Sequence, residues 1–129
     1  MSLLRVIPIV AVSASGTCAA ADTIALPSGI EAQFLDVITD APGMGIAHRY
    51  RFVSPSLTPD RDYVTTEADM AHLCVSYALP RVETAEPRPE AIVITLADRP
   101  VPFGATDPEA VQFFEAYTPQ GTDCLWRDF

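Results

Sequence analysis

The chain has 129 residues, of which 49% are hydrophobic and 19% are charged, a composition that suits one globular domain and leaves no room for two. Seventeen acidic residues stand against eight arginines and no lysine, and the formal net charge is −9. Because nucleic acids and anionic lipid surfaces are bound through clusters of positive charge, this balance argues against both as partners.

The first 21 residues differ in composition from the rest of the chain. Arg5 precedes an apolar run at residues 6–12, and small residues follow as far as Ala21. A positive start, a short apolar stretch and an A-x-A-like end are typical of a secretory signal peptide. The apolar run is shorter than the roughly 20 residues that a membrane span needs. The sequence therefore predicts a periplasmic or secreted protein with no stable membrane span once the signal is removed.

We expect cleavage of the signal peptide between Ala21 and Asp22. The chain is then divided into a signal peptide at residues 1–21 and a single α+β domain at residues 22–129. Two alternatives stay open at this stage. The first segment would form a buried strand if it were retained, and Cys18 would carry a lipid if the protein were a lipoprotein.

Two cysteines, Cys74 and Cys124, stay in the chain after cleavage. Compartments outside the cytoplasm favour disulfides, so we expect a bond between these two side chains. Such a bond would close a loop of about 50 residues, which the chain-entropy model equates with about 4 kcal/mol of stability. A free pair and a metal site are the alternatives, although the chain has no C-x-x-C spacing that would favour a metal.

A β-hairpin is predicted after a short lead-in at residues 22–29. Apolar and polar residues alternate through residues 46–54, which favours a strand that places Arg49 and Arg51 on its wetter face. Residues 30–38 fit the two-residue period only in part, and a strand is favoured over a helix there. These two segments are expected to pair with each other.

Two helices are predicted, one on each side of residues 91–96. The first begins at Thr66, whose hydroxyl can accept from backbone N–H groups, and ends at Pro80. The second begins at Asp107, with Pro108 in its first position. Each has an apolar stripe with helical spacing, formed by Met70, Leu73, Cys74 and Tyr77 in the first helix and by Ala110, Phe113, Phe114 and Tyr117 in the second.

The strongest strand signal lies at residues 91–96, a near-continuous apolar run with β-branched side chains. This pattern is typical of a strand buried on both faces, so the segment is expected at the centre of the sheet. Residues 124–126 are expected to form a short terminal strand. The predicted fold class is α+β, with a small, mostly antiparallel sheet, two helices on one face and one disulfide. The element order is strand, strand, helix, strand, helix and short strand.

Four segments, residues 69–81, 92–104, 112–117 and 124–126, carry a resemblance to a known family. They are similar to a family of short exported bacterial proteins that is catalogued only as a domain of unknown function. The resemblance extends over roughly residues 30–126. It implies export and a paired cysteine, and it carries no activity, so no catalytic residue is transferred to this chain.

The side chains of the first helix suggest two kinds of chemistry. Asp69 and His72 are three residues apart, so both could reach one metal ion if His48 or a distant acid completed the site. The favoured interpretation is a surface histidine paired with a carboxylate. Cys74 and His72 could form a nucleophile and base, but two residues apart on a helix they point in different directions, and a disulfide would consume the thiol. We therefore assign no catalytic residue, no metal ligand and no cofactor.

A candidate binding corner follows the central strand at Asp98, Arg99 and Phe103. Ends of buried strands are common positions for sites in α/β proteins, and aromatic residues are concentrated nearby. The favoured alternative is an ion pair or turn hydrogen bond that anchors the loop.

The leading functional hypothesis is an exported, non-enzymatic binding or accessory module of the cell envelope, with an envelope protein as its expected partner. It rests on the lack of a recognisable nucleophile, metal or phosphate motif in the sequence. The alternative is a small envelope enzyme that uses carboxylates or the Asp98 and Arg99 corner. A calcium- or zinc-binding domain ranks third.

Overall fold

The computed structural model describes residues 2–13, 22–41, 43 and 45–129. Residues 2–13 are exposed and contain neither helix nor strand. The predicted cleavage site and the alternative lipid attachment at Cys18 fall at or within residues 14–21, which lie outside the described residues. Nowhere in the described ranges is there a helix of the length and apolar character that crossing a membrane would need.

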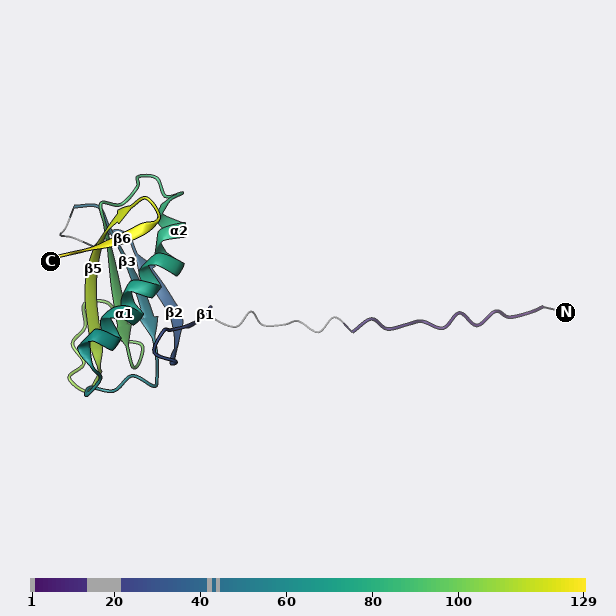
Figure 1. Cartoon of the computed structure of the whole chain (residues 1–129). Helices are drawn as coiled ribbons and strands as arrows, with labels where there is room; N and C mark the ends of the chain where they lie inside the picture. The colour runs from purple at the N-terminus through teal and green to yellow at the C-terminus, as the bar shows by residue number, and fades with distance from the viewer. Residues whose placement is uncertain (1, 14–21, 42, 44) are drawn as a thin grey trace.

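The described part of residues 23–127 forms one six-stranded sheet with a helix across one of its faces (Figure 1). The spatial order of the strands equals their order in the chain: β1 (Thr23–Ala25), β2 (Glu31–Ile38), β3 (Ala47–Val53), β4 (Ala91–Ala97), β5 (Gln112–Gln120) and β6 (Asp123–Arg127). Neighbouring strands are antiparallel except β3 and β4, which are parallel. Parallel neighbours need a crossover connection, and here the helix provides it.

The predicted α+β fold with a small sheet and two helices is wrong. The described chain is mostly sheet, curled into a half-barrel, and its one helix of 20 residues lies between β3 and β4. The segment that was expected to be a second helix is strand β5, and a further strand, β1, lies in the expected lead-in. In place of a helix start, Asp107 forms a turn, because its Oδ1 accepts from the Glu109 N–H at 3.0 Å.

The helical prediction for residues 107–117 failed because its spacing also fits a strand. Phe113 and Tyr117 are four residues apart, which places them on one face of a helix and equally on one face of a strand. The register settles the choice: Phe113 lies opposite Leu96 and Tyr117 opposite Ile92 on the buried strand β4. That strand needs hydrogen-bonding partners along both edges, and β5 supplies one of them.

The helix consists of α1 (Tyr63–Leu73), a π-helical segment η1 (Cys74–Ala78) and α2 (Leu79–Val82). It begins three residues before the predicted start because Asp62 is the N-cap, with Oδ2 accepting from the Thr65 N–H at 3.1 Å. A cap of this kind stabilises a helix by about 1 kcal/mol. Thr66 lies inside the first turn, where its hydroxyl donates to the Asp62 carbonyl.

The helix also continues beyond its predicted end at Pro80. A proline has no N–H to donate, and its ring collides with the carbonyl four residues earlier in a regular α-helix. The turn before Pro80 is wider than an α-turn, since the Leu79 N–H donates to the Cys74 carbonyl five residues back. This π-helical turn carries the helix past Pro80 to Val82.

The main core lies between the helix and the face of the sheet that it covers (Figure 1). Met70 and Leu73 are fully buried against the apolar side chains of β4. Beside them an aromatic cluster forms from Phe34, Phe52 and Tyr77, with the Phe34 and Tyr77 ring centroids 4.9 Å apart. The helix leaves the opposite face of the sheet uncovered.

Candidate functional site

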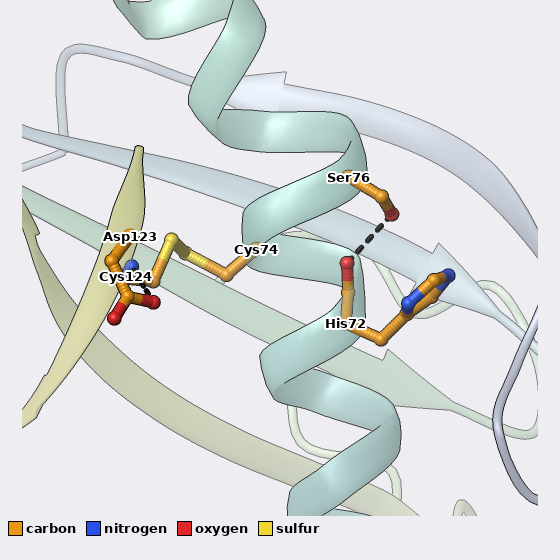
Figure 2. Close-up of a disulfide and its surroundings, with 5 residues drawn as sticks. All are labelled: His72, Cys74, Ser76, Asp123 and Cys124. Carbon is orange, nitrogen blue, oxygen red and sulfur yellow. Dashed lines mark hydrogen bonds between the residues drawn. A yellow bond between two sulfur atoms is a disulfide. The ribbon is translucent and has the colours of Figure 1, made fainter. Parts of the chain in front are cut away.

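Cys74 and Cys124 are joined by a disulfide, which links η1 to β6. Figure 2 shows the Cys74 side chain directed toward β6, whereas the His72 ring lies on another side of the helix. The Cys74 side chain is fully buried. A thiolate–imidazole pair is therefore not formed, and the role of this bond is to hold the last strand against the helix.

The Asp69 side chain, considered with His72 as a metal ligand, is completely buried and fully engaged by other groups. Its carboxylate accepts from the Ser28 N–H at 3.0 Å, from the Ser28 hydroxyl at 2.5 Å and from Arg61 Nη2 at 3.0 Å. It thus fixes the turn between β1 and β2 and the loop before α1. Among the described residues, no group of three or more histidine, cysteine or acidic side chains is placed to hold a metal ion.

Asp98, at the candidate binding corner, closes the base of the loop at residues 98–111. Its N–H donates to the Val111 carbonyl, and its Oδ1 accepts from the Val111 N–H, both at 3.0 Å. Arg99 donates to both carboxylate oxygens at 3.1 and 3.0 Å, and this hydrogen bonding lowers the pKa of Asp98. Asp98 is therefore held as a carboxylate that anchors the loop.

The loop at residues 98–111 folds over the sheet face that the helix leaves uncovered, and a pocket of about 270 Å³ lies between the loop and the sheet. Its walls combine apolar and aromatic side chains with three arginines. The lining residues come from β2 to β5 and from this loop: Leu35, Arg49, Arg51, Phe52, Thr95, Ala97, Arg99, Val101, Pro102, Phe103, Gly104, Ala105, Gln112 and Phe114.

Strand register explains how these side chains meet. Arg51 pairs with Thr95 across the parallel β3–β4 neighbours, and Thr95 pairs with Phe114 on β5, so the three form one row across the sheet. A register shift between Phe34 and Asp36 leaves Leu35 as an extra residue on β2, and this residue also faces the pocket. The face of β3 that was predicted to be solvent-exposed at the arginines is in fact partly covered by the loop at residues 98–111.

Arg51 is the most deeply buried of the three pocket arginines, with 11% of its side chain exposed. Its Nη2 donates to the Val101 carbonyl at 2.7 Å, which ties the loop to the sheet. Its Nε lies 2.8 Å from Asp36 Oδ1, an ion pair whose angle falls short of a hydrogen bond. The guanidinium carbon of Arg51 lies 5.9 Å from the centroid of the Phe103 ring, a cation–π arrangement.

Arg49 differs from the other two pocket arginines in its surroundings. Arg51 faces Asp36 and Arg99 faces Asp98, each within ion-pair distance. The Arg49 Nε is buried and has no hydrogen-bond partner, and no acidic group of the described residues forms an ion pair with its guanidinium. One positive charge of the pocket is thus left without a balancing acid within the described part of the chain.

Of the four pocket residues Arg49, Arg51, Arg99 and Phe103, only Arg99 and Phe103 belong to the binding corner predicted from the sequence. The strand pattern predicts Arg49 and Arg51 on one solvent-facing side of β3, whereas in the structure both line the pocket. The available signal is the spacing of Arg49 and Arg51, because two residues that are two positions apart lie on one face of a strand. The candidate corner of Asp98, Arg99 and Phe103 stays a prediction as a binding site.

Comparison with curated proteins and with solved structures gives no match to this chain. A family model does match, described as a family of unknown function (DUF6497), and it spans residues 9–129. The match therefore includes β2 to β5 and the loop that together form the pocket. Since nearly the whole chain is matched, the protein belongs to this family of unknown function.

Proposed function

We propose that this protein is an exported, non-enzymatic binding domain of the cell envelope and that the pocket beneath residues 98–111 is its ligand site. The observation that carries the proposal is the pocket itself: about 270 Å³, lined by aromatic and apolar side chains and by three arginines. Small-molecule sites have this composition, with an apolar lining and a few placed polar groups.

The role of Asp98 favours binding over the alternative of an envelope enzyme. A general acid at neutral pH needs a raised pKa, whereas hydrogen bonds from Arg99 lower the pKa of Asp98. Both of its oxygens already accept hydrogen bonds that hold the loop. Protonation of this carboxylate during acid–base catalysis would break the hydrogen bonds that hold the loop over the pocket.

The surroundings of Asp22 support a domain that starts at the predicted cleavage site. Asp22 Oδ2 accepts from the Tyr77 hydroxyl at 2.8 Å, and the Asp22 carbonyl accepts from the Phe34 N–H at 3.0 Å. The first residue of the proposed mature chain is therefore already part of the folded domain. The disulfide is a further feature that suits an oxidising compartment.

Export is tested by expressing the full chain in a Gram-negative host and measuring the intact mass of the protein from the periplasmic fraction. We expect a chain that starts at Asp22 and contains two fewer hydrogens than the fully reduced form. As a control, Ala21→Arg places a bulky charge at the cleavage site and should leave the precursor uncleaved. A full-length chain in the cytoplasm, or a lipid mass on Cys18, would contradict cleavage after Ala21.

The binding site is tested by NMR on the ¹⁵N-labelled protein with a panel of small aromatic probes that includes neutral, cationic and anionic members. We expect the shifted amide signals to gather on β3, β4, β5 and residues 98–111. Phe103→Ala should weaken every probe that binds, because the ring forms part of the pocket wall. Phe129→Ala, which removes an equal ring from an exposed position outside the pocket, is the matched control. Shifts that scatter over the surface would contradict a single site.

A further inference from the structure

We propose that the ligand of this pocket is a small monocarboxylate with an apolar body, and that its carboxylate binds Arg49. This inference rests on the proposed function, because it assigns the ligand class of the same pocket. Two observations support it: the unbalanced charge of Arg49 and the apolar wall formed by the loop and by β5.

The charge of the pocket indicates one negative group on the ligand. Three arginines line the pocket, and among the described acids Asp36 and Asp98 each form an ion pair with one of them. The remaining guanidinium, that of Arg49, has a buried Nε with no hydrogen-bond partner. Buried polar groups are nearly always satisfied by protein or by water, and Arg49 lines the pocket, where a ligand can supply its partner. One carboxylate would neutralise the surplus charge and accept hydrogen bonds from the Arg49 guanidinium.

The geometry of a guanidinium favours a carboxylate in particular. Its planar fork of N–H donors matches the two oxygens of a carboxylate, and the pair is stronger than a hydrogen bond between neutral groups. Arg51 already uses one fork nitrogen on the Val101 carbonyl, and Arg99 uses two on Asp98. Arg49 is therefore the pocket arginine whose guanidinium makes no hydrogen bond or ion pair with the described residues, which leaves its pocket-facing N–H groups for a ligand.

The rest of the lining indicates an apolar body for the ligand. Phe103 and Phe114 are each about half exposed, so a ligand between them would bury aromatic surface that now faces solvent. Leu35 on β2 and Val101 in the loop add aliphatic surface to the same space. A purely polar anion would leave these side chains uncovered.

The test uses isothermal titration calorimetry with probes that differ in charge while keeping one body: phenylacetate against phenylacetamide, and hexanoate against hexanamide and hexylamine. We expect each carboxylate to bind at least about tenfold more tightly than its amide, since a charge-assisted hydrogen bond is lost in the amide. The amine should bind more weakly still, because it adds positive charge beside Arg49. Hexyl phosphate, which has a similar apolar body and more negative charge than hexanoate, serves as a comparison.

Arg49→Gln is the decisive variant, and Arg88→Gln is its control, because Arg88 is exposed, lies outside the pocket and changes the net charge equally. Arg49→Gln should remove the preference for carboxylate over amide while leaving amide binding within about threefold. Arg88→Gln should leave both unchanged. The melting temperature of unliganded Arg49→Gln should be equal to or above that of the parent, because an unpaired charge is removed, and Arg49→Lys should keep part of the preference.

Either of two results with the parent protein would overturn the inference and leave the proposed function standing: equal binding of carboxylate and amide at the pocket, or tighter binding of hexyl phosphate than of hexanoate. A carboxylate preference that survives Arg49→Gln would equally overturn it. If no probe shifts the pocket amides in the NMR experiment, the proposed function fails together with the inference.

Discussion

Replacing both bonded cysteines, as Cys74→Ala with Cys124→Ala, should lower the free energy of unfolding by about 4 kcal/mol. The disulfide closes a loop with a sequence separation of 50 residues, and without it the unfolded chain gains the entropy of that loop. Alanine avoids placing an unsatisfied hydroxyl at the fully buried position 74.

Urea unfolding followed by circular dichroism measures this change. Reduction of the parent protein with a phosphine should reproduce the effect of the double variant, whereas the same reductant should leave the variant unaffected. We expect β6 to lose order first, since this edge strand is paired with β5 on one side only and the disulfide ties it to η1. A change below about 1 kcal/mol would mean that packing alone holds the last strand in place.

The second large effect is expected at Asp69, where Asp69→Ala should cost about 3–5 kcal/mol. This carboxylate is fully buried and receives three hydrogen bonds, two from Ser28 and one from Arg61. Its removal leaves the Arg61 guanidinium, whose side chain is 11% exposed, without its ionic partner. Chemical denaturation gives the magnitude, and the matched control is Asp60→Ala, because Asp60 is an exposed acid in the same loop and should cost less than about 0.5 kcal/mol.

A paired substitution separates the buried charge from simple loss of contact. Arg61→Met combined with Asp69→Leu removes both charges and fills the space with apolar side chains. It should therefore be less destabilising than Asp69→Ala alone. If the double variant were less stable than Asp69→Ala, the loss of stability would come from the hydrogen bonds to Ser28 and not from the isolated guanidinium.

The strands with one clear period could be predicted from the sequence. Residues 46–54 alternate cleanly, and residues 91–96 are apolar throughout, so the pairing of β2 with β3 and the central position of β4 follow from simple patterns. The segment that became β5 could not be assigned in this way. Its spacing satisfies both helix and strand, and the choice depends on which neighbour the open edge of β4 finds in the folded chain.

The candidate site was only half predictable for a related reason. Arg99 and Phe103 could be singled out because a loop that follows a buried strand is a common position for function. The contribution of Arg49 and Arg51 depends on how residues 98–111 fold back across β3, a contact between segments about 50 positions apart in the chain. No local pattern encodes that contact, so two arginines that line a pocket resemble ordinary surface residues in the sequence.

The strand order has a consequence for how the chain can assemble. Because every strand of the described sheet lies beside the strand that precedes it in the sequence, no later strand has to be inserted between two earlier ones. The sheet can grow in one direction, from β1 toward β6, with each addition completing the exposed edge left by the last. Contacts that are near in sequence form quickly, and the longest connection, between β3 and β4, contains the helix, which is itself a local structure. A chain that becomes available from its N-terminus onward can therefore fold as it appears, and Cys124 meets Cys74 only at the final step.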